Sequence, residues 1–328
     1  MIKVIFENYF SDKYDNKIKK FGIKTISILH TEYFGLLYCC PDLLRKLYQL
    51  KKFDVVNFHV EQDYYLFRKI GIKNLQLMPN YLTYDPNSVT CSDLKYKNII
   101  LLGEDITVKY MEFGIKVMNL IVKEVENARM YVVTYKKRRL FDLAQKLGID
   151  KYITFIENCD NPAPYIKNSS VMLYTSLIEA FPQALGEGLS FCLPVVTNNL
   201  HFLQLTQKNV INVKADDQDS MAKEVIKLLN NYNYKLNAGR QVKVFIKEFS
   251  HYNTTKKWLQ LIDALLQDKN KIDKYFNRMN LDQNLKKYER KSRALFELTR
   301  NRLPKCKNLT FEDVTELYKV KNFNSQCI

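Results

Sequence analysis

The chain has 328 residues, of which 46% are hydrophobic and 26% charged. At about 100–200 residues per domain this length allows two α/β domains, and the composition excludes a disordered or fibrous chain. The longest apolar stretches, such as Ile99–Leu102, fall far short of the roughly 18–20 residues that cross a bilayer. The first residues predict a strand and not a signal peptide, so we expect a cytoplasmic protein.

Basic residues outnumber acidic ones, 51 to 35, which gives a net charge of +16. Such an excess favours phosphate-bearing partners, among them nucleotides, nucleic acids and anionic membranes, although an AT-rich gene would raise the lysine content for no functional reason. The nine glycines form neither a G-x-G-x-x-G nor a Walker loop. Charge alone therefore leaves the partner open.

The seven cysteines include no C-x-x-C pair and form no metal-ligand pattern with the four histidines. We therefore predict no metal site, no cofactor and no disulfide framework. Cys192, between Phe191 and Leu193, is expected to be a buried thiol that packs as a small hydrophobe.

Residues 1–90 carry short apolar runs that predict a small α/β unit, with strands at about 2–6, 24–29, 54–58 and 75–78. From residue 97 to about 250, β-branched runs alternate with longer helical patterns, which predicts a parallel sheet with crossover helices. Its expected strands are 98–102, 129–134, 152–156, 170–174, 194–197 and 209–213, and its expected helices are 108–125, 137–147, 183–190, 219–231 and 236–248. Ligands of such a sheet lie beyond the carboxyl ends of its strands.

Two further segments follow this sheet. Residues 251–266 predict an amphipathic helix, and 267–328 predict a basic helical tail. Within the tail, residues 285–303 place leucines and a tyrosine against lysines and arginines. That pattern fits either packing against the first unit or contact with an anionic membrane surface.

The segment from Ser176 to Glu187 is the most informative one, because two glutamates bracket a predicted strand–loop–helix turn. Pro182 suits the start of a helix, where the amides of about Gln183 to Leu185 would be unpaired donors that can bind a pyrophosphate. Glu179 and Glu187 could then accept hydrogen bonds from a sugar and from a ribose. Alternatively, Glu179 caps the helix and Glu187 is a solvated surface residue.

This segment and the Leu193–Thr197 strand resemble the donor-site motif of glycosyltransferase family 4, whose members are retaining enzymes of GT-B fold. The resemblance is to the members that act in bacterial polysaccharide biosynthesis. Further matches are the strand Lys97–Gly103, the linker residue Asn80 and the segment Phe249–Leu259. The resemblance implies two Rossmann-like domains, the first shortened (1–90) and the second binding the donor (97–250), a crossover helix at 251–266 and the tail at 267–328. It implies catalytic residues His30, Lys109 and Glu179, and donor-binding residues Gly103, Glu104, Lys109, Ala180, Phe181, Pro182, Gln183 and Glu187.

Several positions depart from the family pattern. Glu104 replaces an arginine expected on the diphosphate, and Ala180 replaces a glycine. A glycine-containing G-D-G-P turn is replaced by Thr134–Lys137, where the basic run 136–139 offers substitute cations or a solvated face. Family members also begin with a strand and glycine loop for which this chain starts too late.

Other candidates have simpler interpretations. Asp217-Gln218-Asp219 resembles a metal-binding D-x-D pattern, but it precedes Ser220 and a helix, so we expect a helix cap. His59 and His201 are expected to be core or surface residues.

We therefore expect a cytoplasmic glycosyltransferase, peripheral on the inner membrane face, that moves a sugar from a nucleotide-diphosphate sugar to a glycan or lipid-linked acceptor. Two alternatives stay open. Glu104 and the short first domain fit a catalytically inactive sugar-nucleotide-binding paralogue or partner subunit, and the net charge fits a basic protein that binds nucleic acid or a membrane surface, although no nucleic-acid recognition motif is present.

Overall fold

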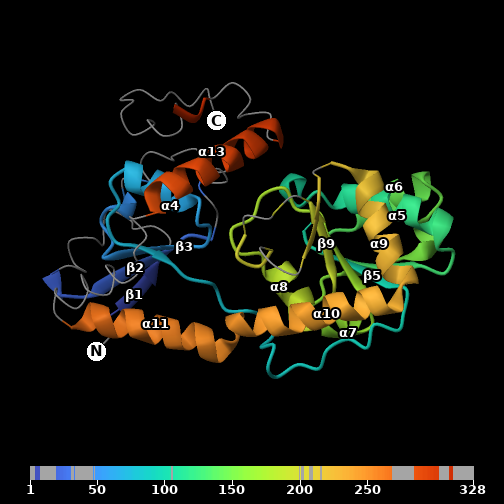
Figure 1. Cartoon of the computed structure of the whole chain (residues 1–328), viewed down its shortest axis with the longest axis horizontal. Coiled ribbons are helices and arrows are strands. Elements are labelled where there is room, and N and C mark those ends of the chain that lie inside the picture. The colour runs from blue at the N-terminus through green and yellow to red at the C-terminus, as the bar shows by residue number, and fades with distance from the viewer. Residues whose placement is uncertain are drawn as a thin grey trace.

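The computed structural model describes residues 4–7, 20–30, 33, 47, 49–104, 106–198, 200, 203–206, 210–214, 216–267, 284–302 and 310–312. These residues form two lobes, each built on one parallel sheet, and two long helices run along one side of both lobes (Figure 1). The expected α/β fold of two Rossmann-like sheets with a helical C-terminal region is confirmed.

The N-terminal lobe contains a four-stranded sheet in the order β1-β2-β3-β4, with every neighbouring pair parallel. The strands are β1 (Val4–Glu7), β2 (Lys24–Ile28), β3 (Val55–Phe58) and β4 (Leu75–Leu77), and helix α4 (Asp63–Lys69) connects the last two. The predicted strands thus end within two residues of the observed ones. Residues 2 and 3, where the first strand was expected to begin, lie outside the described residues.

The second lobe contains a six-stranded sheet in the order β10-β9-β8-β5-β6-β7. Its strands are β5 (Asn98–Leu102), β6 (Arg129–Thr134), β7 (Ile153–Glu157), β8 (Val171–Tyr174), β9 (Val195–Asn198) and β10 (Ile211–Val213). This is the doubly wound order. Strands β5 to β7 follow one another toward one edge of the sheet and strands β8 to β10 toward the other, so the order reverses between β5 and β8. The side chains of β8 and nearly all of those of β5 are buried, as continuous apolar runs covered on both faces should be.

The helices of this lobe are α5 (Met111–Glu124), α6 (Arg138–Lys146), α7 (Ala163–Lys167), α8 (Gln183–Ser190), α9 (Gln218–Asn230) and α10 (Tyr232–Ile246). Helix α5 starts later than predicted, because residues 107–109 form a separate 3-10 turn that ends at Tyr110 in the left-handed region. Helix α10 starts earlier, because the Asn231 side chain caps it by accepting a hydrogen bond from the Tyr234 amide at 2.9 Å. Helix α7 was not predicted, since five residues are too few to display a helical period.

Helix α11 (His251–Leu266) leaves the second lobe and packs on the N-terminal sheet. Leu261 and Leu265 are buried there in one cluster with Ile26, Val55 and Met78. The Ser250 side chain caps the helix. The helix therefore joins the lobes a second time, beside the connecting segment at residues 79–97.

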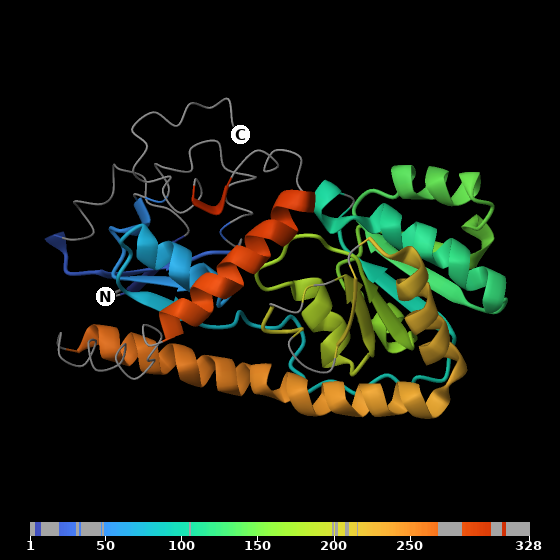
Figure 2. The ribbon, with the colours of Figure 1, turned by 45° about the horizontal axis from the view of Figure 1, so that its top comes forward.

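Helix α13 (Leu285–Arg302) lies across α4 of the N-terminal lobe (Figure 2). The Tyr288 ring contacts Tyr64 at 5.5 Å, and Lys291 Nζ lies 2.5 Å from a carboxylate oxygen of Glu61. The apolar stripe of this helix is thus used for packing against the first lobe. The other parts of the expected tail, 268–283, 303–309 and 313–328, lie outside the described residues.

The prediction of no disulfide was wrong, because Cys91 and Cys192 are disulfide-bonded. The connecting segment runs beside the end of α8, where the Ser92 amide donates to the Phe191 carbonyl at 2.9 Å. This contact brings together two cysteines that are 101 residues apart in sequence, a distance over which spacing predicts no pairing. Cys192 is buried as expected, but it is not a free thiol.

Three smaller expectations concern the helix cap, the histidines and the membrane. Asp217 caps α9, and its side chain accepts from the Ser220 amide at 2.9 Å, which confirms the cap. His59 is a buried residue as expected, whereas His201 lies outside the described residues. None of the described helices combines the length and apolarity that a bilayer span requires.

Candidate active site

A cleft of about 1210 Å³ separates the two lobes. The N-terminal lobe contributes Ile28 and His30, the connecting segment contributes Asn80, Tyr81 and Thr83, and α11 forms a further wall. All predicted site residues except Ala180 line this cleft. The structure therefore brings together residues that span positions 30 to 187 of the sequence.

The second lobe presents the carboxyl ends of its central strands to the cleft. Gly103 and Glu104 follow β5, and the segment leading to Glu179 follows β8. These two strands are the neighbours between which the sheet order reverses. Ligands of doubly wound sheets bind at this reversal, where the loops after the two strands diverge and leave a crevice.

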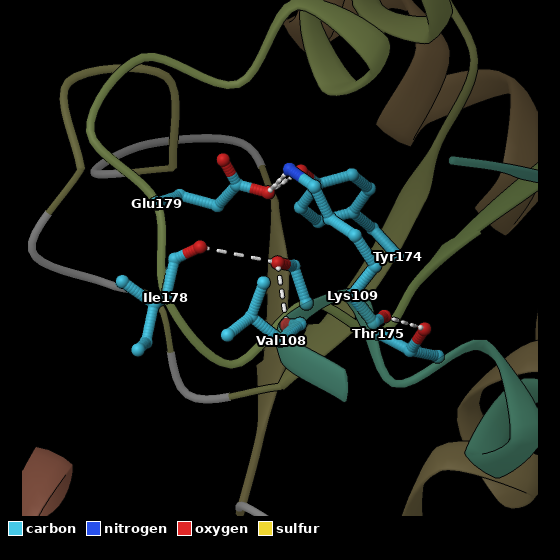
Figure 3. Close-up of polar contacts among 7 residues, drawn as sticks. Val108, Lys109, Tyr174, Thr175, Ile178 and Glu179 are labelled. Atoms are coloured by element: carbon cyan, nitrogen blue, oxygen red, sulfur yellow. Dashed lines mark hydrogen bonds and ion pairs between the residues drawn. The ribbon is translucent and has the colours of Figure 1, made fainter. Parts of the chain in front are cut away.

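Glu179 is 8% exposed and is held by two donors at this crevice (Figure 3). Its Oε1 atom lies 2.6 Å from Nζ of Lys109 and also accepts a hydrogen bond from the hydroxyl of Tyr174. Tyr174 is buried, and burial, followed by the charge of Glu179, raises the pKa of its phenol well above the usual range. The phenol therefore stays protonated and acts as a donor.

Hydrogen bonds fix the loop that carries Glu179 to the turn that carries Lys109. The hydroxyl of Thr175 donates to the Lys109 carbonyl at 3.0 Å, and the hydroxyl of Ser176 donates to the Val108 carbonyl at 3.1 Å (Figure 3). The Leu177 amide donates to the same Val108 carbonyl at 2.8 Å. The geometry between the lysine and the glutamate is thus set by backbone contacts on both sides.

The amino end of α8 faces the cleft. Pro182 precedes the first helical residue, and the helix begins at Gln183 as predicted. Its first amides have no partner inside the helix and lie at the positive end of the helix dipole, which favours an anion. The Gln183 side chain turns away to donate to the Tyr81 carbonyl at 2.8 Å. This bond ties the amino end of α8 to the connecting segment.

Glu187 lies in the second turn of α8, half-buried at the cleft. It accepts a hydrogen bond from Thr83, but burial is the larger influence and raises the pKa of its carboxyl. The solvated-surface interpretation of Glu187 is therefore wrong. Gly186, beside it, allows the connecting segment to approach closely, because a Cβ there would lie 2.5 Å from the Leu82 side chain.

His30 follows β2 and faces the cleft from the N-terminal lobe. Its Nδ1 atom lies 3.4 Å from the side-chain amide of Asn80, the residue of the predicted linker. Behind it, His59 is buried between the lobes, with its ring 6.2 Å from that of His30 and 5.6 Å from that of Phe181. The Nδ1 atom of His59 donates to the Met78 carbonyl, which fixes its tautomer.

The departures from the family pattern have different structural consequences. Ala180 is buried and is not among the residues of positive φ, so the backbone does not require the glycine that the family has there. Glu104 is exposed at the cleft and makes no ion pair within the described part of the chain. None of the basic residues 136–139 is among those that line the cleft, and the last three pair with Glu157, Asp142 and Glu112.

Two residues of the site were not predicted. Tyr174 was assigned only to a strand, although a tyrosine at the carboxyl end of an otherwise apolar strand is a signal that its hydroxyl needs a partner there. Thr83 lies in the connecting segment and carries no pattern of its own. Over the residues with described placement, no group of three or more His, Cys, Asp or Glu could hold a metal ion.

Residues 96–231 match the family model described as glycosyl transferases group 1. This region of the chain is similar to a group 1 glycosyltransferase domain. The matched region comprises the second sheet and its helices through α9, and it contains Lys109, Glu179 and Glu187. No curated protein gives a significant match to the sequence.

Solved structures of glycosyltransferases share the fold at low sequence identity. Pneumococcal GtfA, an O-GlcNAc transferase solved with UDP and GlcNAc, has a TM-score of 0.69 and 12% identity over 81% of this chain and 57% of its own. HepE of Anabaena, solved with UDP and glucose, has a TM-score of 0.67 and 12% identity over 80% of this chain and 78% of its own.

A variant of S. aureus TarM, solved with fondaparinux, α-GlcNAc-glycerol and UDP, has a TM-score of 0.61 and 14% identity over 72% of this chain and 50% of its own. The chain thus spans about half the length of TarM and of GtfA. These likenesses establish the GT-B fold that the glycosyltransferase domain and the two-lobed arrangement indicated.

Proposed function

We propose that the protein transfers a sugar from a nucleotide-diphosphate sugar to a glycan or lipid-linked acceptor, with retention of anomeric configuration, as glycosyltransferase family 4 enzymes do. The observation that carries this proposal is the juxtaposition of Lys109, Glu179 and the amino end of α8 in one interlobe cleft. The UDP complexes of HepE and GtfA support the choice of a nucleotide sugar.

In this proposal the diphosphate lies between Lys109 and the first amides of α8. Both groups are positive and lie at the cleft before the substrate arrives, so they would stabilise charge that develops on the leaving diphosphate. Glu187 would accept hydrogen bonds from the ribose hydroxyls at the second turn of the same helix. Glu179 would accept a hydrogen bond from the transferred sugar.

In this proposal the acceptor binds against the opposite wall of the cleft, which the N-terminal lobe and helix α11 form. His30 reaches the cleft from the N-terminal lobe, so it would contact the transferred sugar from the face opposite Glu179. Ile28, Trp258 and Leu259 make this wall apolar. An acceptor with an apolar portion, such as a lipid-linked saccharide of polysaccharide biosynthesis, fits this composition.

We also propose that the protein lies on the anionic, cytoplasmic face of a membrane through α13. Lys286, Lys287 and Arg290 of this helix are exposed, while the helix packs on α4. Near an anionic surface each such cation contributes about 1 kcal/mol. Sedimentation with phosphatidylglycerol vesicles should capture the protein at low salt and release it at high salt, whereas phosphatidylcholine vesicles should capture none at either.

Thermal unfolding in the presence of nucleotide sugars tests the proposed activity at the level of binding. At 100 times its Kd a ligand of the folded state adds about 2.7 kcal/mol, enough to raise the Tm by a few degrees. We expect this with UDP-glucose, UDP-N-acetylglucosamine or GDP-mannose at millimolar concentration. Absence of any shift, together with tight and salt-dependent binding of single-stranded DNA, would favour the nucleic-acid alternative instead. NMR of the product, compared with the donor, tests retention.

A further inference from the structure

The hydroxyl of Tyr174 is a buried polar group at the carboxyl end of a central, otherwise apolar strand. Tyr174 is the last residue of β8, is 2% exposed, and follows the buried apolar residues Val171, Met172 and Leu173. Phenylalanine would fill the same space without a buried polar atom that must find a partner. The reason for a hydroxyl at this position is therefore its acceptor, which is Oε1 of Glu179.

The two donors on Glu179 share one oxygen. Lys109 Nζ and the Tyr174 hydroxyl both meet Oε1, and Figure 3 shows the second carboxylate oxygen directed away from them. One donor carries a positive charge and the other is neutral. Only the charged donor, Lys109, is drawn to a diphosphate by a net positive charge.

We infer that Tyr174 is a positioning residue that holds Glu179 in place when Lys109 turns to the diphosphate of the donor. This inference rests on the proposed function, because it requires a diphosphate in the cleft. Arrival of a diphosphate gives Lys109 a second and more strongly charged acceptor. Glu179, which is buried, then keeps the Tyr174 hydrogen bond, and its second oxygen stays directed to the sugar.

The chemistry at this position excludes simple alternatives to tyrosine. A lysine or arginine at position 174 would be a second cation beside Lys109. It would also be attracted by the diphosphate and would then no longer hold Glu179. An apolar residue would leave Oε1 of the buried carboxylate without either of these donors once Lys109 turns to the diphosphate. A phenol avoids both outcomes because it donates without carrying charge.

The substitution Tyr174→Phe tests this role by separating binding from turnover. We expect the Kd for UDP, or for GDP if that is the nucleotide that binds, to change by less than about threefold. We expect kcat for hydrolysis of the matching nucleotide sugar to fall about tenfold or more, the usual effect of losing a hydrogen bond to a charged group. Tyr288→Phe, which removes a buried phenol from α13 outside the cleft, is the matched control and should change neither quantity.

A double-mutant cycle with Glu179→Gln shows whether Tyr174 acts through Glu179. If it does, Tyr174→Phe lowers kcat in the wild-type background and has little further effect in the Glu179→Gln background. The double variant also removes the buried charge together with its donor, so comparing it with Glu179→Gln still measures the effect of Tyr174→Phe in that background if Tyr174→Phe alone does not fold.

Each outcome discriminates between the two proposals. Equal losses of nucleotide affinity and kcat in Tyr174→Phe, an unchanged kcat, or fully additive effects in the cycle would overturn the positioning role while leaving the proposed function intact. A wild-type protein that binds none of the nucleotides would overturn the proposed function, and this inference with it.

Discussion

Lys109 and Glu179 form an ion pair of 2.6 Å across the reversal point of the second sheet, 70 residues apart in the chain. Glu179 is almost fully buried, whereas the lysine side chain is 30% exposed. The charge of the glutamate is therefore stabilised mainly by its partner, whereas water also stabilises the charge of the lysine. Removing one member of such a pair leaves an uncompensated buried charge.

We predict that Lys109→Met lowers the free energy of unfolding by about 2–3 kcal/mol, below the range for fully buried pairs because the lysine is partly solvated. The double variant Lys109→Met/Glu179→Gln should recover most of this loss, since it removes the charge as well. Urea unfolding of both variants measures the difference. Additive losses in the double variant would show that the pair does not contribute through its charges.

Glu104 provides a test of where the diphosphate binds. This exposed carboxylate lines the same cleft as Lys109 and makes no ion pair among the described residues, so in the proposed function it would repel the diphosphate that Lys109 attracts. We predict that Glu104→Arg tightens nucleoside-diphosphate affinity about tenfold or more, since a guanidinium–phosphate contact replaces a repulsion. Calorimetric titration with UDP and GDP measures this.

The control for this variant is Glu126→Arg, which makes the same change in net charge at an exposed position outside the cleft. It should leave the affinity nearly unchanged. If the control tightens binding as much as Glu104→Arg does, net charge and not proximity is responsible, and the diphosphate does not lie beside Glu104.

The sequence predicted the second sheet well, because its central strands are buried on both faces and are therefore apolar along their whole length, as in Ile99–Leu102. Helix α8 was predictable from Pro182 and the residues after it. The contacts inside the site could not be predicted from the sequence. Glu179 meets Lys109 and Tyr174 only because the sheet order places β8 beside β5, and no local pattern encodes that order. The Cys91–Cys192 disulfide was missed for the same reason.

Glu187 should give nucleotide binding a characteristic pH dependence. Burial raises the pKa of this carboxyl. The ionised carboxylate accepts a hydrogen bond from a ribose hydroxyl better than the protonated carboxyl does. We therefore predict that affinity for UDP or GDP falls as the pH is lowered, beginning at a higher pH than an ordinary glutamate would cause. Glu187→Gln should lose this component, and Glu187→Ala should weaken binding by about 1.5–3 kcal/mol at neutral pH. Parallel pH curves for wild type and Glu187→Gln would exclude Glu187 from the ribose site.

His59 should make folding stability sensitive to acid. Burial, together with the neighbouring His30, lowers the pKa of His59 from 6.5 to about 4, against the hydrogen bond to Met78. As the pH falls below about 6.5, the unfolded chain takes up a proton that the folded chain does not, so stability is lost between pH 6.5 and 4. From pH 7 to pH 5 this linkage amounts to about 2 kcal/mol.

The variant His59→Gln isolates that contribution, because glutamine can still donate to the Met78 carbonyl but does not titrate. Urea unfolding at pH 7 and at pH 5 should show a loss in the wild type that is larger by about 2 kcal/mol than the loss in the variant. Equal losses would mean that His59 is protonated in the folded protein at pH 5.

The release of nucleoside diphosphate from a nucleotide sugar tests the central claim most directly. The purified chain is incubated with UDP-glucose, UDP-N-acetylglucosamine or GDP-mannose, with water as the acceptor, and the nucleotides are separated by chromatography. We predict slow release from at least one of these donors, and a rate at least tenfold lower in Lys109→Met, whose cleft lacks the cation for the leaving diphosphate. Nucleotide binding without any release, or release at the same rate in Lys109→Met, would contradict the account and would favour a protein that binds nucleotide sugars without transferring them.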